Sequence, residues 1–254
     1  MNVLIGIPSG GSPTPPFLAS LAALTLPPGA TFDRCIVTGN FVPAQRELIV
    51  TRALERKADV LVMCDDDMIL PPDAIVALTD LLAANPRCAL AGALYYSRDG
   101  FRPMVVSAWN PHDTTTAVIP PFDRTPIEVD GVGFGCVVVR MDAVRELEPL
   151  YFSAHVFLEP GAGNVRVCNE DYLFCHRLRS RGWGVMLHPS VRAGHYDRAT
   201  QTTQPLEWES SQRSLQTRMA AIVDGKLQLV PAGDAPSRGE RHQRADIEYL
   251  SPER

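Results

Sequence analysis

The chain has 254 residues, of which 45% are hydrophobic and 21% are charged, so it is long enough to bury the core of one substantial α/β domain. Its formal net charge of −5 argues against a general nucleic-acid-binding protein, and nucleic acid is not indicated as a partner. No apolar run approaches the ~20 residues that span a bilayer, and no basic leader stands at the start. We therefore expect no membrane span and a cytoplasmic location.

The cysteines are spread along the chain without a C-x-x-C pair, and most lie in apolar surroundings. This pattern predicts reduced, buried thiols rather than a disulfide framework or a zinc site. The six are Cys35, Cys64, Cys88, Cys136, Cys168 and Cys175.

The chain opens with a short apolar run over residues 2–7, which predicts a strand. Pro8, Ser9 and Gly10 follow, and they predict a loop in which glycine lets the backbone approach a ligand closely. No Lys or Arg occurs in residues 1–33, so we expect this loop to contact a base or a ribose rather than to hold phosphates. A plain strand-to-helix turn is the alternative interpretation.

Residues 17–24 predict a short helix, residues 33–38 a second strand, and a longer helix is expected from about Pro43 to Lys57. Arg46 falls in the first turn of that longer helix. If the strands are parallel, Arg46 faces the crevice at the carboxyl edge of the sheet and is a candidate nucleotide contact. An exposed arginine on an amphipathic helix is equally compatible with the pattern.

An apolar run over residues 60–64 ends abruptly in Asp65, Asp66 and Asp67. A buried strand cannot also hide three acids, so the acids must lie at the edge where open α/β sheets bind ligands. Their mutual repulsion favours compensation by a divalent cation or a hydrogen-bonded ligand. In an extended backbone Asp65 and Asp67 face one way and Asp66 the other. An acidic turn before a helix is the alternative.

A helix over residues 72–84 and a buried strand over residues 88–93 come next. The alternation of strands and helices through this first part predicts an α/β fold with a doubly wound, mostly parallel sheet.

These motifs resemble the GT-A fold of nucleotide-sugar-dependent glycosyltransferases, in particular the family-two type. The D-x-D region of the family is resembled by Asp65 to Asp67, with Ile69 to Asp73 behind them. Its first-strand loop is resembled by residues 7–10. The helix start that reaches the donor nucleotide is resembled by residues 43–46. The resemblance covers residues 2 to 197 approximately. It implies a Rossmann-like sheet with a small second sheet and a nucleotide-sugar donor, most commonly a UDP-sugar.

The proline-rich interval from Ser97 to Pro126 has little periodicity and is interpreted as an inserted flap near the acceptor or as an irregular surface loop. Residues 127–140 then combine a glycine-rich bend with a buried strand. In the resembled family this stretch lies under the donor sugar and the acceptor. Alternatively, Gly131, Gly133 and Gly135 permit a bulge.

A second acidic motif, Glu170 and Asp171, stands at the start of an amphipathic helix that is expected to end near Gly182. The helix dipole favours ionised carboxylates at this end. The motif resembles the E-D motif of the family, which implies that Asp171 is the catalytic base, with Glu170 as its neighbour and fallback. Simple acidic capping of the helix is the alternative.

A last short strand is expected over residues 185–187, and His195 follows it. In many GT-A enzymes a late histidine completes the metal site, so the resemblance implies that Asp67 and His195 bind a divalent cation, Mn²⁺ or Mg²⁺. His188 is the competing candidate, and a purely structural histidine remains an alternative.

Residues 206–223 suggest a further helix, and the segment after Pro231 has few apolar residues and nearly balanced charge. We therefore expect a GT-A domain over residues 1–225 and, over residues 226–254, a polar tail that is disordered or forms a partner-contacting arm in a homo-oligomer.

The function expected is a metal-dependent, inverting glycosyl transfer from a nucleotide diphosphate donor to a hydroxyl of an unidentified acceptor. The donor-binding residues would be Asp65 and Asp66, with Arg46 and the loop from Pro8 to Gly10. A noncatalytic nucleotide- or sugar-binding module is the main alternative. A sugar-phosphate nucleotidyltransferase is less favoured, because it would carry a Lys- or Arg-bearing glycine loop after the first strand.

Overall fold

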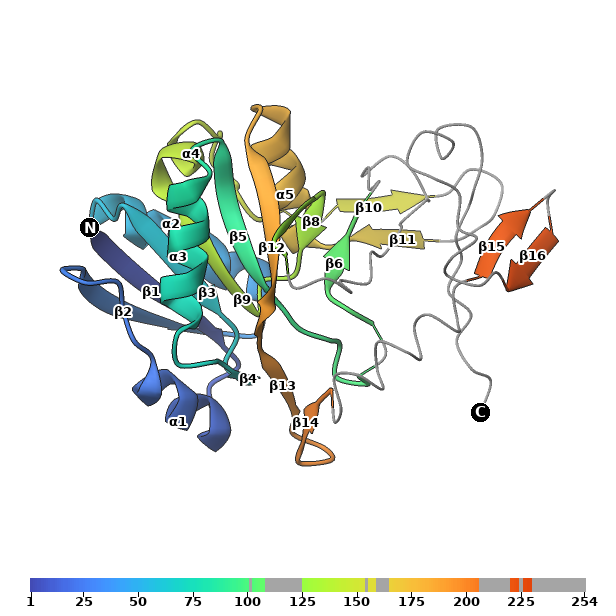
Figure 1. Cartoon of the computed structure of the whole chain (residues 1–254), viewed down its shortest axis with the longest axis horizontal. Coiled ribbons are helices and arrows are strands. Elements are labelled where there is room, and N and C mark those ends of the chain that lie inside the picture. Colours follow the sequence, from blue (N-terminus) through green and yellow to red (C-terminus); the bar gives the residue numbers. More distant parts are fainter. Residues whose placement is uncertain are drawn as a thin grey trace.

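The computed structural model describes residues 1–100, 102–107, 125–153, 155–158, 165–205, 220–223 and 226–229. Its centre is a seven-stranded sheet with the strand order β2-β1-β3-β9-β5-β12-β7 (Figure 1). Five of these strands run in one direction, whereas β9 and β7 run against them. The bounds are Asn2–Ser9 for β1, Thr31–Thr38 for β2, Val60–Cys64 for β3, Cys88–Leu94 for β5, Ile127–Val129 for β7, Cys136–Arg140 for β9 and Gly184–Arg192 for β12.

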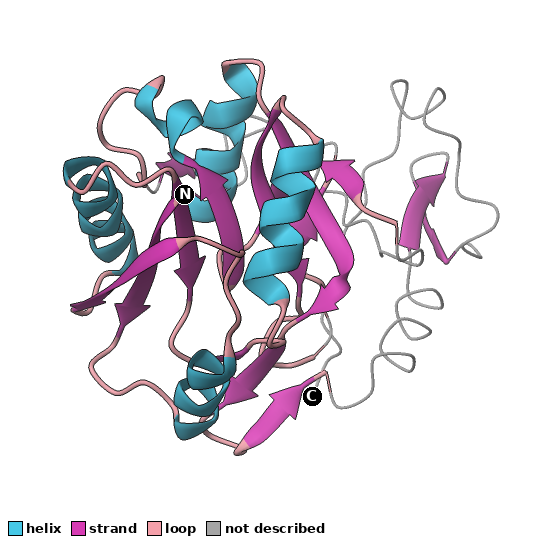
Figure 2. Ribbon diagram, turned by 60° about the vertical axis from the view of Figure 1, so that its left-hand side comes forward, coloured by secondary structure: helices cyan, strands magenta, loops and turns pink. Residues whose placement is uncertain are grey.

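Helices cover both faces of this sheet (Figure 2). Buried residues of α2, α4 and α5 belong to the core on one face, and those of α1 and α3 belong to the core on the other. Neighbouring residues of β1 divide between the two cores, Leu4 on one side and Val3 and Ile5 on the other, as the pleat of a strand requires. The helices are α1 (Pro15–Ala23), α2 (Val42–Glu55), α3 (Ala74–Ala84), α4 (Met141–Arg145) and α5 (Glu170–Ser180).

The prediction of a doubly wound, mostly parallel α/β sheet is confirmed, and so is the small second sheet. That second sheet has the order β14-β13-β4, in which all neighbours are antiparallel. It consists of β4 (Met68–Ile69), β13 (Gly194–Asp197) and β14 (Thr202–Gln204). Because β4 begins directly after Asp67, this sheet joins the end of β3 to the late segment that carries His195.

Three further antiparallel pairs complete the described structure. They are β6 (Val105–Val106) with β8 (Gly131–Val132), β10 (His155–Leu158) with β11 (Val165–Cys168), and β15 (Ala220–Val223) with β16 (Lys226–Leu229). No helix in the described part of the chain is both long and apolar enough to cross a membrane.

The expected helix over residues 206–223 is wrong at its end, because its last four residues form β15 and pair with β16. The two strands are separated in sequence by Asp224-Gly225, a pair typical of two-residue hairpin turns, and this signal favours a hairpin over a helix. Residues 206–219, most of the proline-rich interval and the tail beyond residue 229 lie outside the described residues.

Two glycines of the glycine-rich bend make room for a tyrosine. A Cβ atom at Gly133 would overlap the Tyr95 hydroxyl. The backbone N–H of Gly135 donates to that hydroxyl at 3.1 Å. Gly133 and Gly135 are therefore explained by close approach to Tyr95, whereas a Cβ atom at Gly131 would meet the ring of Tyr172 at 3.0 Å.

The cysteines agree with the prediction wherever their side chains are described. Five are buried and free, namely Cys35, Cys64, Cys88, Cys136 and Cys175. The side chain of Cys168 lies outside the described part.

Candidate functional site

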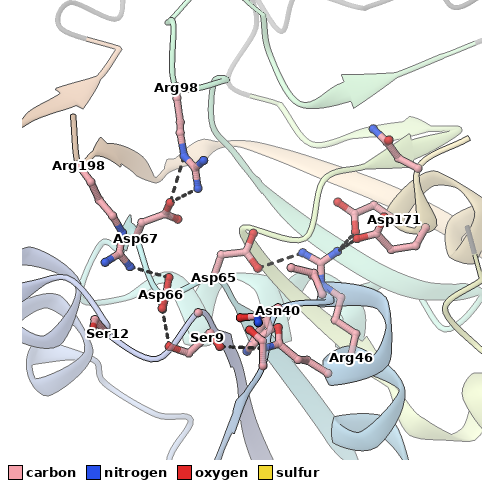
Figure 3. A pocket seen from close by; sticks show the side chains of 17 residues that line it. Ser9, Ser12, Asn40, Arg46, Asp65, Asp66, Asp67, Arg98, Asp171 and Arg198 are labelled. Atoms are coloured by element: carbon pink, nitrogen blue, oxygen red, sulfur yellow. Dashed lines mark hydrogen bonds and ion pairs between the residues drawn. The ribbon is translucent and has the colours of Figure 1, made fainter. Parts of the chain in front are cut away.

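A cavity of about 660 Å³ opens at the carboxyl ends of β1, β2 and β3 (Figure 3). It collects residues from the β1 loop, the start of α2, the end of β3 and the start of α5. Nine of the residues expected at the site line it: Pro8, Ser9, Gly10, Arg46, Asp65, Asp66, Asp67, Glu170 and Asp171. The tenth, His195, lies against Asp67 and outside the lining.

All three aspartates line this cavity, so the expectation that Asp66 faces away from its neighbours is wrong. Strand β3 ends at Cys64, and residues 65–67 form a turn in which the N–H of Met68 donates to the carbonyl of Asp65 at 3.2 Å. Side chains alternate only in an extended backbone, and a turn removes that constraint.

Each aspartate is paired with a different arginine. The distances are 3.0 Å from Arg46 to Asp65, 3.1 Å from Arg198 to Asp66 and 2.6 Å from Arg98 to Asp67. The repulsion expected within the acidic run is therefore relieved by guanidinium groups in this structure.

Arg46 is a buried residue of the cavity lining and not an exposed helix arginine. Its side chain is only 3% exposed, and one terminal nitrogen bonds Glu170 at 2.8 Å and also Asp171. Its buried Nε has no hydrogen-bond partner among the described residues, and the ring centroids of Phe134 and Phe152 lie 5.3 and 6.0 Å from the guanidinium carbon. Arg46 thus joins the two acidic motifs within the lining of the cavity.

The Asp171 carboxyl group has a pKa close to neutral pH. Burial raises its pKa to about 7, and although Arg46 opposes this shift, the negative charges of Glu170 and Asp65 reinforce it. One of its oxygens accepts the backbone N–H of Phe134 at 3.2 Å, and the other accepts from Arg46. A carboxylate fixed in this way, with a pKa near the working pH, is suited to accept a proton.

The small second sheet places His195 beside Asp67. His195 is paired with Met68 across β13 and β4, and the N–H of Tyr196 donates to the carbonyl of Asp67 at 2.8 Å. His195 Nδ1 lies 2.9 Å from the Tyr96 carbonyl, which can only accept, so Nδ1 carries a hydrogen. Nε2 then faces Asp67 Oδ2 at 3.5 Å.

Charge couples these two groups. Burial opposes the charge on Asp67, but the interactions with His195 and Arg98 outweigh it and hold the Asp67 pKa below its usual value. Burial likewise opposes protonation of His195, yet Asp67 raises the His195 pKa above its usual value.

Two neighbouring side chains, Asp67 and His195, are of the types that could hold a divalent cation. Asp67 offers carboxylate oxygen and His195 offers an imidazole nitrogen, and the Tyr96 carbonyl fixes the ring as outer-shell partners of metal-bound histidines do. Within the described ranges, no three His, Cys, Asp or Glu side chains surround one metal position. A divalent cation here would need further ligands from water or from a bound molecule.

His188, the competing histidine, lies on β12 and is not part of the cavity lining. Its Nδ1 is buried without a hydrogen-bond partner in the part of the chain that the structure describes. Burial lowers the pKa of His188, which favours a neutral ring.

Sequence reasoning did not assign Arg98 and Arg198 to the site, nor Asn40 and Asn169, although all four line the cavity. Arg98 stands in the proline-rich interval directly after a buried strand, and Arg198 stands in a turn after β13. Nothing in the local sequence distinguishes these arginines from ordinary surface arginines. Their role depends on long-range contacts with Asp67 and Asp66.

One side chain ties together the two loops that follow β1 and β2 at the cavity. Gln45 Nε2 donates to the carbonyls of Ser9 at 2.7 Å and Gly39 at 3.0 Å. The hydroxyl of Ser9 in turn donates to Asp66 at 2.5 Å. The β1 loop, the β2 loop and the aspartate turn therefore form one hydrogen-bonded unit.

Comparison with known proteins informs the fold alone. No family model and no curated protein matches this chain. Among solved structures, the crystal structure of A197 from STIV is similar, with a TM-score of 0.55 and 18% sequence identity over 80% of this chain and 93% of that chain. At this level of identity the similarity supports a Rossmann-like α/β fold.

Proposed function

We propose that this chain is a metal-dependent glycosyltransferase that moves a sugar from a nucleotide diphosphate donor, most commonly a UDP-sugar, to an acceptor hydroxyl. One observation carries the proposal: the aspartate turn and the Glu170-Asp171 motif, far apart in sequence, line a single cavity. Glycosyl transfer needs a site that neutralises a leaving diphosphate and a base that activates the acceptor, and both must reach one anomeric carbon.

The donor nucleotide would occupy the end of the cavity formed by the β1 and β2 loops. Ser9, Gly10, Gly39 and Asn40 present backbone and amide groups to the cavity there. Such a surface suits a base and a ribose. Asp65, fixed by Arg46, lies next along the cavity floor and would accept a ribose hydroxyl.

The diphosphate would lie over Asp66 and Asp67. Asp67 and His195 would hold a divalent cation, which would supply positive charge to the departing nucleoside diphosphate. His195 keeps its Nε2 directed at Asp67 because its Nδ1–H is held by Tyr96. Asp66 positions the β1 loop through the Ser9 hydroxyl.

Asp171 would accept the proton of the acceptor hydroxyl as that oxygen attacks the anomeric carbon. The N–H of Phe134 and the guanidinium of Arg46 hold the carboxylate in place at the start of α5. A single displacement assisted by one base inverts the anomeric configuration. If NMR of the product shows retention, the role given to Asp171 is wrong.

One feature favours the alternative of a noncatalytic nucleotide- or sugar-binding module. Both oxygens of Asp171 already have partners in this structure, so a module that only binds would need no change at this group. Catalysis requires Arg46 or Phe134 to share Asp171 with the acceptor.

The test is release of nucleoside diphosphate from a panel of nucleotide sugars incubated with the protein and manganese. We expect release that is lost in Asp67→Asn and in Asp171→Asn. Asp80→Asn is the matched control, because Asp80 is an exposed carboxylate on α3 outside the cavity lining. Donor binding without release, across a broad panel of acceptors, would favour the noncatalytic module. Release of pyrophosphate from a nucleoside triphosphate and a sugar phosphate would favour the nucleotidyltransferase.

A further inference from the structure

The three arginines that face the aspartate row differ in how firmly the fold holds them. The side chain of Arg46 is 3% exposed, whereas Arg98 is 63% exposed and Arg198 is 46% exposed. Their partners Asp67 and Asp66 are buried, at 3% and 12%. Figure 3 shows Arg98 and Arg198 pointing toward the aspartates, while Arg46 approaches from the side of α2.

The two outer arginines stand on backbone that is already fixed by its own hydrogen bonds. The turn bearing Arg98 is closed by the N–H of Gly100, which donates to Ser97 at 2.8 Å, and by the N–H of Ser97, which donates to Arg102 at 2.8 Å. The turn bearing Arg198 is held by the Asp197 carboxylate, which accepts the N–H of Ala199 at 2.9 Å. Exchange of partners therefore requires only side-chain rotation.

The net charge of the cavity favours a change of partners by Arg98 and Arg198 when an anionic ligand enters. Five carboxylates and three guanidiniums line it, so it is net negative as it stands and would repel a diphosphate. An ion pair with a half-exposed guanidinium adds little stability, whereas an arginine that meets a phosphate can form two parallel charge-assisted hydrogen bonds. A diphosphate thus competes well for Arg98 and Arg198.

We propose that Arg98 and Arg198 bind the diphosphate of the donor, and that in the empty cavity Arg98 occupies the place of the divalent cation on Asp67. The proposal rests on the donor class inferred above. When donor and cation enter together, the guanidinium of Arg98 leaves Asp67 for phosphate oxygen, and Asp67 with His195 is released to bind the cation. Arg98 and the cation are therefore competitors for one carboxylate.

Asp66 differs from Asp67 in its second partner, which is the Ser9 hydroxyl and not His195, the other proposed cation ligand. The Ser9 hydroxyl donates to Asp66 at 2.5 Å, so Asp66 remains hydrogen-bonded after Arg198 departs. Arg198 consequently contributes to diphosphate binding without competing for the metal position. The two arginines should be separable by experiment.

The experiment measures two affinities of the full chain by titration calorimetry: Mn²⁺ without nucleotide, and uridine diphosphate in the presence of Mn²⁺. Arg98→Ala should bind Mn²⁺ about tenfold more tightly than the wild type, because the guanidinium that competes for Asp67 is gone. The same variant should bind uridine diphosphate at least about tenfold more weakly. Arg198→Ala should weaken uridine diphosphate binding to a similar extent but leave the affinity for Mn²⁺ unchanged. Effects of opposite sign in one variant are not produced by partial unfolding.

Arg102→Ala is the matched control, since Arg102 lies in the same turn but outside the cavity lining, and both affinities should stay at wild-type values. Unchanged or weaker Mn²⁺ binding by Arg98→Ala overturns the exchange on Asp67. Unchanged uridine diphosphate binding by both cavity variants overturns the phosphate role while the proposed function stands. If the wild-type protein binds no nucleoside diphosphate from any of the common bases, the proposed function and this inference both fail.

Discussion

Replacing Arg46 with methionine should destabilise the protein in a pH-dependent manner. Arg46 is the buried cation that contacts Asp65, Glu170 and Asp171. Methionine retains most of the apolar stem that packs near Phe134 but leaves the carboxylates without their counter-ion. Breaking a buried ion pair by removing one partner costs about 3–5 kcal/mol, and we expect a loss of that size at pH 8.

The pH dependence follows from Asp171. Its pKa is about 7 in the folded protein, above the ordinary value of about 3.9 expected in the unfolded chain. The folded state therefore binds more protons, and this group makes stability fall as the pH rises from about 4 to about 7. Loss of Arg46 raises the pKa further and extends the fall to higher pH. At pH 5 Asp171 is protonated with or without Arg46, so the loss should shrink to roughly half or less.

Urea unfolding followed by far-ultraviolet circular dichroism at pH 5 and pH 8 measures both losses. Arg52→Met on the same helix is the matched control, because Arg52 lies outside the cavity and contacts Cys35 instead, and its unfolding midpoint should stay near the wild-type value. Adding Asp171→Asn to Arg46→Met should recover part of the stability at pH 8. A loss below about 1 kcal/mol at pH 8, or an equal loss at both values, would refute the reasoning.

Three further outcomes are expected. Asp171→Asn should lower the rate of transfer by about 10²–10⁴-fold while nucleotide affinity stays within a few fold, and an equal loss of affinity in calorimetry would contradict its role as a base. In the wild type, kcat/KM should rise with pH to a plateau above about 7, as Asp171 loses its proton, and a flat profile between pH 5 and 9 would contradict that assignment. Gly133→Ala should destabilise the fold by about 1–3 kcal/mol through overlap with the Tyr95 hydroxyl, and Tyr95→Phe should restore part of the loss in a thermal unfolding assay.

Most of the sheet follows from local sequence because its strands are short apolar runs bounded by glycine, proline or acid. The run that ends at Cys64 shows why: continuous burial forces the next three acids out to the edge of the sheet. The edge at which they emerge is shared with the start of α2, since parallel strands align their carboxyl ends. By this argument the sequence predicts that Arg46 lies at the same edge of the sheet as Asp65.

The features that sequence did not predict depend mostly on contacts between distant segments. The turn at residues 65–67 is closed locally by the N–H of Met68 on the Asp65 carbonyl, and β4, directly after it, pairs with the distant strand β13. The local sequence does not show that Arg98 and Arg198 are counter-ions. An arginine that pairs with a buried carboxylate cannot be distinguished from a surface arginine until the position of that carboxylate is known. The position of β9 between β3 and β5, antiparallel to both, likewise depends on pairing between segments far apart in sequence. The apolar pattern of β9 predicts a strand but not its neighbours.

The most direct test of the account is a crystal structure of the protein with Mn²⁺ and uridine diphosphate, using the anomalous signal of manganese to locate the ion. We predict one ion within bonding distance of Asp67 and His195, with the diphosphate bridging it and Asp171 facing the same cavity. Manganese and nucleotide bound at any other place, with this cavity unchanged, would contradict the account.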